Sequence, residues 1–183
     1  FKKLLCCQTA IPSQALLTKT ISDQRKLNTV ANRVALQINC KLGGELWRLH
    51  IPMKSILVIG IDVYHCHLSK SRNSAVGFVS SLNDSLTRWF SRTAFQTQSC
   101  EIVESLRTFC AQAISKYYEL NHQLPKKVIV YRDGIGDGQI NASLQLEIEP
   151  MLEAIRSFSE GYDPQLLYIL VRKRIKTRYF YRS

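Results

Sequence analysis

The stretch that decides the fold reads Val128-Ile129-Val130-Tyr131-Arg132-Asp133-Gly134-Ile135-Gly136-Asp137-Gly138-Gln139. Its apolar first part ends abruptly at Arg132-Asp133, and three glycines follow within the next five residues. This pattern is typical of a buried strand that brings a carboxylate to the end of a sheet and then turns sharply. Ile56 to Asp62 has the same form, an apolar run that ends in an aspartate. The two stretches therefore predict two carboxylates at one edge of a sheet.

Helices and strands are predicted around these two stretches from the spacing of apolar residues. In chain order they are a helix over 27–42, strands over 56–64, 75–81 and 88–96, a helix from about 99 to 121, a strand over 128–131, a helix over 147–159 and a strand over 165–171. From residue 55 onward this order predicts an α/β fold with a mixed sheet. An antiparallel meander of three strands, followed by a helix and a parallel strand, is the ribonuclease H arrangement, in which the first and fourth strands are neighbours. That arrangement places Asp62 beside Asp133.

Charge is distributed unevenly along the 183 residues, whose net charge is +11. Residues 1–54 carry nine Lys and Arg and two acids, and residues 172–183 carry six Lys and Arg and no acid. A basic surface around a carboxylate centre suits a protein that binds or cuts a polyanion, because cations release counterions from a phosphate backbone. A generally basic soluble protein would show the same charge, so charge alone leaves both interpretations open. No apolar run of about 18 residues predicts a membrane span.

The cysteines and histidines do not predict a metal or redox site. The six cysteines have no C-x-x-C spacing, which favours reduced thiols in an intracellular protein. His65 and His67 flank Cys66, but no further ligand group has the spacing of a zinc site. The serine-rich loop that follows lacks Walker spacing, which argues against an ATPase.

The two strand-end aspartates are candidates for a magnesium site. Hydrolysis of a phosphodiester needs an activated water and a neutralised leaving oxygen, and two Mg²⁺ ions about 3.5–4 Å apart supply both. Since Mg²⁺ prefers carboxylate oxygens, a third acid should join Asp62 and Asp133 from the connecting helix, where Glu101 and Glu104 lie. Taken singly, each aspartate can be a turn residue, and Glu101 can simply suit the helix dipole. The remaining acids of this region are interpreted as solvated or loop charges: Asp137, Glu147, Glu149 and Glu153.

Five stretches, in family order over nearly the whole chain, resemble a Piwi-clade Argonaute protein. They are Pro12-Ser13-Gln14, Asn39 to Trp47, Gly60 to His65, Tyr131 to Gln139 and Lys173 to Arg178. The resemblance implies the end of a Rossmann-like MID domain over residues 1–54, which would bind the 5′ phosphate of a guide. It implies most of a ribonuclease H-like PIWI domain over residues 55–183. A fragment of a longer protein is expected, because the chain begins with Phe1 in mid-pattern and the family continues beyond Ser183.

The resemblance assigns the candidate acids to the slicer site of the family, which consists of Asp, Glu, Asp and a final His or Asp. Asp62 corresponds to the first aspartate, Asp133 to the second, and Glu101 to the glutamate, with Glu104 as the alternative. The fourth residue is expected beyond Ser183, so these residues would form three-quarters of a site. The implied cofactor is Mg²⁺, or Mn²⁺.

The resemblance also assigns a pocket for the guide 5′ phosphate to Lys2, Gln14, Gln37 and Lys41. Gln37 and Lys41 are four residues apart on the predicted helix and therefore share one face. Taken alone, Lys41 can equally be a basic residue that suits the helix C-terminus. The glutamine at position 37 fits the Piwi clade, because many other Argonaute proteins have lysine there, and it leaves room for a metal ion beside the phosphate.

The function that the resemblance implies is the silencing of complementary transcripts, such as transposons, guided by Piwi-interacting RNA (piRNA) in the germline during gametogenesis. The implied partners are the guide, the target RNA and Tudor-domain proteins, in cytoplasmic germ granules or the nucleus. Two hypotheses remain open: a slicer in the intact protein, or an inactive guide-binding protein that recruits partners. An unrelated ribonuclease H-like nuclease or integrase is disfavoured by the basic N-terminal segment with its Gln and Lys pocket.

Overall fold

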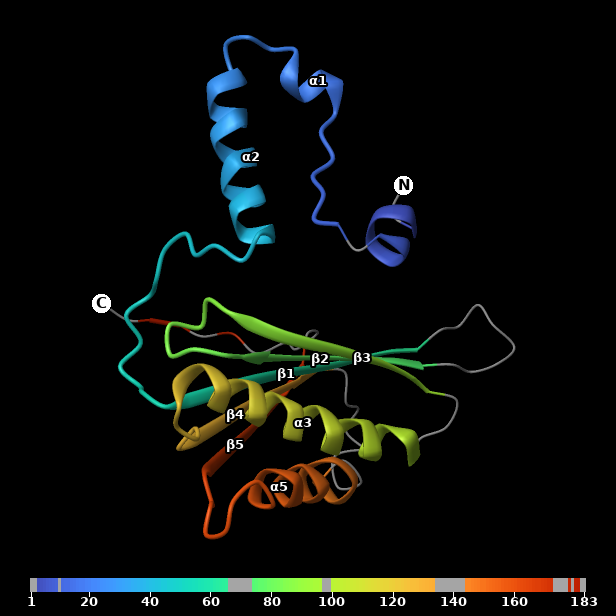
Figure 1. Ribbon diagram of the computed structural model, residues 1–183, viewed down its shortest axis with the longest axis vertical. Coiled ribbons are helices and arrows are strands. Elements are labelled where there is room, and N and C mark those ends of the chain that lie inside the picture. The colour runs from blue at the N-terminus through green and yellow to red at the C-terminus, as the bar shows by residue number, and fades with distance from the viewer. Residues whose placement is uncertain are drawn as a thin grey trace. The chain divides into compact units, whose positions relative to one another are not determined.

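The computed structural model describes residues 3–9, 11–65, 74–96, 100–133, 144–172, 178 and 180–181. The chain divides into two compact units, Phe1–His50 and Ile51–Ser183 (Figure 1). The assignment of residues 1–54 to a MID domain and of residues 55–183 to a PIWI domain stays a prediction. Within the described residues, no helix combines the length and the apolar character needed to span a membrane.

The first unit contains a short π-helix and two α-helices. They are η1 (Lys3–Gln8), α1 (Thr18–Ile21) and α2 (Leu27–Lys41). The predicted helix over 27–42 is therefore present, and Gly43, with a φ of 86°, stops it in a left-handed conformation that glycine adopts readily. The apolar stripe of α2 lines a groove of this unit together with Leu16 and Ile21.

The second unit is built on a five-stranded mixed sheet in the order β3-β2-β1-β4-β5. The strands are β1 (Ile56–His65), β2 (Ser74–Ser81), β3 (Trp89–Gln96), β4 (Lys127–Asp133) and β5 (Gln165–Val171). The first three form an antiparallel meander, and β4 pairs in parallel with both β1 and β5. The predicted ribonuclease H-like sheet is confirmed, with β1 and β4 as neighbours.

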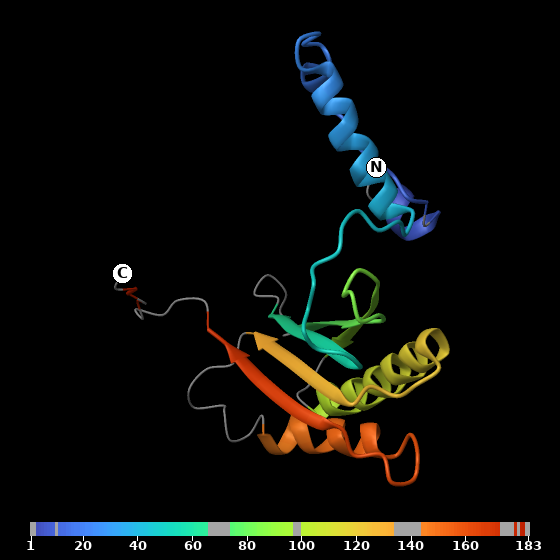
Figure 2. The same cartoon turned by 90° about the vertical axis from the view of Figure 1, so that its left-hand side faces the viewer.

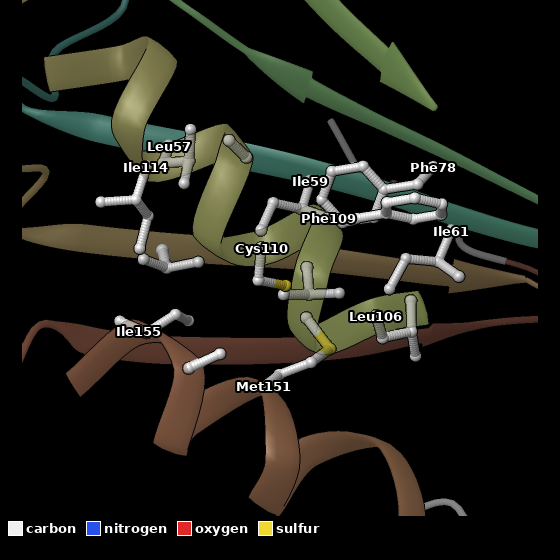
Figure 3. Packing of buried hydrophobic residues seen from close by; sticks show 14 of the residues in the cluster. Leu57, Ile59, Ile61, Phe78, Leu106, Phe109, Cys110, Ile114, Met151 and Ile155 are labelled. Carbon is white, nitrogen blue, oxygen red and sulfur yellow. The ribbon is translucent and has the colours of Figure 1, made fainter. Parts of the chain in front are cut away.

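Helices cover one face of this sheet (Figure 2). They are α3 (Cys100–Asn121), the π-helix η3 (Leu144–Ile148) and α5 (Glu149–Arg156). Figure 3 shows the apolar core between the sheet and these helices, which includes Ile59 and Phe78 of the sheet, Phe109 of α3 and Met151 of α5. Each fully buried aliphatic or aromatic side chain of this kind stabilises the fold by about 1.5–3 kcal/mol. The core therefore lies between this face and the helices.

The predicted helix over 147–159 differs from the structure. The α-helical part begins at Glu149 and ends at Arg156, and the π-helix η3 precedes it. Pro150 stands in the first turn, where its missing N–H costs nothing. The interpretation of Glu147 as a solvated or loop charge is wrong, because Glu147 lies in η3 and is buried. Glu149 and Glu153 are exposed, as predicted, and Asp137 lies outside the described residues.

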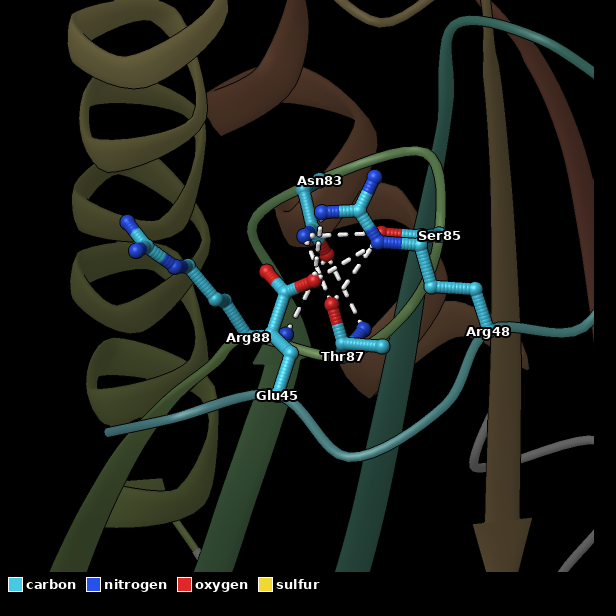
Figure 4. Close-up of polar contacts among 6 residues, drawn as sticks. All are labelled: Glu45, Arg48, Asn83, Ser85, Thr87 and Arg88. Carbon is cyan, nitrogen blue, oxygen red and sulfur yellow. Dashed lines mark hydrogen bonds and ion pairs between the residues drawn. The ribbon is translucent and has the colours of Figure 1, made fainter. Parts of the chain in front are cut away.

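The turn between β2 and β3 is held by the side chains of Asn83 and Asp84. Asn83 accepts the backbone N–H of Thr87 at 3.0 Å and donates to the Thr87 hydroxyl at 2.8 Å (Figure 4). Asp84 accepts the backbone N–H of Ser55 at 3.0 Å and the hydroxyl of Tyr117 at 3.2 Å. These contacts tie the turn both to the start of β1 and to α3.

Among the described residues, the opposite face of the sheet carries several exposed side chains. Strand residues alternate between faces, so the neighbours of inward residues point to this side. Large hydrophobic side chains with substantial exposure on this face are Tyr64, Val79, Trp89, Phe95, Tyr131 and Leu167. Asp62 and Asp133 belong to the same face. Asp133 is the last residue of β4, as predicted, but β1 continues past Asp62 to His65, so the prediction that Asp62 ends its strand is wrong.

Candidate carboxylate site on β1 and β4

Asp62 and Asp133 lie at the same level of two neighbouring parallel strands. The paired residues run from Ile56 opposite Lys127 to Ile61 opposite Arg132, and the two aspartates follow next on each strand. Ile61 and Arg132 are buried under the helices, so alternation directs both aspartates to the other face. Asp62 is exposed and Asp133 is half-buried. The structure thus places the two aspartates that the sequence pattern singled out at neighbouring positions on one face of the sheet.

Glycine keeps the surroundings of Asp62 open. Gly77 of β2 is paired directly with Asp62. A Cβ atom at Gly77 would come no closer than 3.9 Å to another heavy atom, the Asp62 carbonyl oxygen. The position opposite Asp62 is therefore free of a side chain, which leaves the carboxylate accessible from the exposed face.

The third predicted ligand lies in the helix that follows the meander. The backbones of Glu101 and Glu104 belong to the first turns of α3, but their side chains lie outside the described residues, as does residue 99, near which the helix is predicted to begin. His65 ends β1, while Cys66 and His67 lie outside the described residues. Among the residues whose side chains are described, no three His, Cys, Asp or Glu gather as metal ligands would.

A buried ion pair behind Asp133 was not predicted from the sequence. Arg132 Nε lies 2.9 Å from Glu147 Oε2 and Arg132 Nη2 lies 3.0 Å from Glu147 Oε1, so the pair is bidentate. The Tyr168 hydroxyl donates to Glu147 Oε2 at 2.8 Å. A signal was present: Arg132 takes the inward position that follows Val128 and Val130, and a charge there requires a buried partner.

The charge of Arg132 is stabilised by this pairing. Burial acts to lower the pKa of Arg132, but the hydrogen bonds and negative charge of Glu147, with further contributions from Tyr168 and Asp62, raise that pKa above its ordinary value. The guanidinium therefore stays protonated at any pH at which the protein folds. A permanent positive charge therefore lies on the helix-covered side of the sheet, opposite the face that carries Asp62 and Asp133.

Two of the residues predicted to bind the guide 5′ phosphate, Gln14 and Lys41, contact each other in the first unit. Lys41 Nζ donates to Gln14 Oε1 at 2.7 Å and also to the backbone carbonyl of Ser13. Gln37 is exposed on α2, one turn before Lys41. Lys2 lies outside the described residues. The structure therefore joins Lys41 to Gln14, which stands 27 positions earlier in the sequence.

The donor set at the sheet edge suits a hard divalent cation. Asp62 and Asp133 offer carboxylate oxygens, the ligands that Mg²⁺ prefers, from two neighbouring strands. Two adjacent carboxylates also concentrate negative charge, which favours a cation between them. On donor chemistry and accessibility, the described residues fit part of a magnesium site.

The chain matches the Piwi domain family over residues 1–183. It is 42% identical over 179 residues to Piwi-like protein 1 of Gallus gallus, and 41% identical over 182 residues to Piwi-like protein Ago3 of Bombyx mori. These alignments cover 98% and 100% of this chain but only 20% of each relative, so the chain spans about a fifth of their length.

Solved structures share the fold. The crystal structure of Drosophila Piwi aligns with a TM-score of 0.74 at 24% identity, over 88% of this chain and 22% of that chain. The C-terminal lobe of a budding yeast Argonaute aligns with a TM-score of 0.70 at 27% identity, over 82% of this chain and 32% of that chain. By its family match, its relatives and its mixed sheet, the chain belongs to the Piwi domain family of Argonaute-like proteins.

Proposed function

We propose that the chain binds a small guide RNA and takes part in RNA-guided silencing, and that its full-length protein cuts the paired target. The observation that carries the proposal is the register of β1 and β4, which sets Asp62 beside Asp133 on an accessible face. A solved relative, the Argonaute of Kluyveromyces polysporus, is described with a guide RNA, which supports guide binding here.

In the proposed cleavage, Asp62, Asp133 and Glu101 hold the cofactor, Mg²⁺ or Mn²⁺. When bound, such ions activate a water and neutralise charge at the scissile phosphate. Asp62 lies on the central strand, β1, which is hydrogen-bonded to β2 on one side and to β4 on the other. The backbone from which its carboxylate projects is therefore held in place. Asp133 is the last residue of β4, and Gly77 leaves the position opposite Asp62 without a side chain.

Guide anchoring is proposed for Lys2, Gln14, Gln37 and Lys41. The two oxygens that Lys41 contacts, from Ser13 and Gln14, belong to uncharged groups. These contacts orient the ammonium group and leave its positive charge available to a phosphate. Gln37 adds an uncharged amide on the same helix face. The net charge of +11 strengthens the attraction of the whole chain for RNA.

The finer parts of the proposal follow the family. The guide is a piRNA, the targets are transcripts such as those of transposons, and Tudor-domain proteins are partners in the germline. The protein acts in cytoplasmic germ granules or the nucleus during gametogenesis. These assignments rest on the similarity to Piwi-like proteins.

The test is cleavage of a matched RNA by the guide-loaded full-length protein in Mg²⁺. Asp62→Ala and Asp133→Ala should each lower the single-turnover rate by at least about a hundredfold, since each removes a charge that stabilises the transition state. Asp163→Ala is the matched control, because Asp163 is an exposed acid paired with Arg156. Cleavage that survives Asp133→Ala would refute the catalytic assignment. Guide binding without cleavage by the unaltered protein would favour the alternative, a binder that acts through recruited partners.

A further inference from the structure

The buried cluster of Arg132, Glu147 and Tyr168 joins three elements on the helix-covered side of the sheet, behind Asp133. The side chains of Arg132 and Glu147 are only 6% and 8% exposed. Arg132 comes from the end of β4, Glu147 from η3 and Tyr168 from β5. The cluster therefore fixes the position of the end of β4 relative to its neighbours on the helix-covered side.

Stability alone does not explain this cluster. Removal of two charges from water is costly, and well-packed apolar side chains of similar size usually stabilise a core equally well or better. The preceding inward positions of β4, Val128 and Val130, are apolar and fully buried. An ion pair at the next inward position therefore suggests a role in fixing geometry.

The third contact of the guanidinium shows what geometry is fixed. Arg132 Nη1 donates to the backbone carbonyl of Asp133, while Nε and Nη2 hold Glu147. The carbonyl belongs to the peptide unit through which the chain leaves β4. Since Arg132 and Asp133 point to opposite faces, the guanidinium acts on Asp133 through the backbone.

We propose that Arg132, held by Glu147 and Tyr168, is a positioning residue that sets the backbone of Asp133 so that its carboxylate shares a divalent cation with Asp62. This inference rests on the proposed function, because it assigns a partner to the proposed catalytic aspartate. A carboxylate ligand must be held to within about 0.5 Å, and a strand end gains such precision only from supporting contacts. The bidentate pair and the carbonyl contact are those supports.

The decisive variant replaces the whole cluster by apolar side chains: Arg132→Met, Glu147→Leu and Tyr168→Phe together. It removes both charges of the ion pair together with the hydroxyl that donates to Glu147, so the full-length protein should fold and bind guide RNA as before. The half-saturating Mn²⁺ concentration for cleavage should rise about 10–100-fold, as when a supporting shell around a metal ligand is lost. An unchanged Mn²⁺ dependence in a folded variant would overturn the inference.

A milder pair of variants keeps the test valid if the triple variant fails to fold. Tyr168→Phe removes one hydrogen bond to Glu147 but leaves the ion pair, and it should raise the half-saturating Mn²⁺ concentration by a few fold. Tyr162→Phe is the matched control, because the Tyr162 hydroxyl donates to the Pro125 carbonyl at 2.7 Å, at the other end of β4. Equal effects of the two changes would contradict the positioning role.

Direct Mn²⁺ binding separates this inference from the proposed function. Electron paramagnetic resonance of Mn²⁺ with guide-free protein should show a site that Asp133→Ala removes and that the cluster variants weaken. If the unaltered protein shows this site but does not cut RNA, the proposed cleavage fails and the inference is judged on Mn²⁺ affinity alone. If no Mn²⁺ site depends on Asp133, the inference is overturned.

Discussion

Replacement of Lys41 by glutamine tests the guide-binding half of the proposal. The ammonium group is exposed, so solvent screens its attraction to a phosphate, and the lower part of the range for a charged hydrogen bond applies, about 1–2 kcal/mol. The expected loss of affinity for a 5′-phosphorylated guide is therefore about 5–30-fold. Glutamine can still bond to Gln14, and an exposed substitution should change the unfolding free energy by less than about 0.5 kcal/mol.

The assay is the Kd for a 5′-phosphorylated and a 5′-hydroxyl guide, measured with the full-length protein at several salt concentrations. Lys41→Gln should weaken the binding of the 5′-phosphorylated guide and leave the binding of the 5′-hydroxyl guide largely unchanged. The slope of log K against log salt should become shallower by about 0.7, as expected for one lost contact to a single strand. Lys19→Gln, an exposed lysine of α1, is the matched control. An equal loss with both guides would refute the assignment of Lys41 to the 5′ phosphate.

Two further predictions concern the core. Phe78→Ala should lower the unfolding free energy by about 3–5 kcal/mol, because Phe78 is fully buried and its ring lies 5.7 Å from that of Phe109. Phe78→Leu leaves a smaller cavity and should lower the unfolding free energy clearly less, as measured by chemical denaturation. Equal losses for the two variants would contradict the reasoning that the cavity causes the loss. Burial raises the pKa of Cys110 from 9.0 to about 12, so the unfolded state ionises first and stability should fall as the pH rises from 9 towards 12, by about 1.4 kcal/mol at pH 10. Cys110→Ala should remove this part of the slope in denaturation measured between pH 8 and 10, and identical slopes would show that the thiol is not responsible.

The sequence by itself determined the local elements and, through their order, the strand neighbours. The apolar runs before Asp62 and Asp133 predicted two strands, and the meander followed by a crossover helix left β1 and β4 side by side. Prediction of this kind succeeds because alternation and helical spacing are properties of short segments, and because few topologies satisfy the connection rules.

The tertiary structure alone decided which distant groups meet. Glu147 looked like a loop charge, and only the packing of η3 against the sheet brings it to Arg132, 15 residues earlier. Likewise, the contact of Lys41 with Gln14 spans a turn and two helices. Local patterns report whether a position is inward or outward but not which side chain arrives opposite it, because that depends on the path of the chain between them. For the same reason the sequence pattern singled out Asp133, while the packed fold was needed to show that Arg132 contacts its backbone carbonyl.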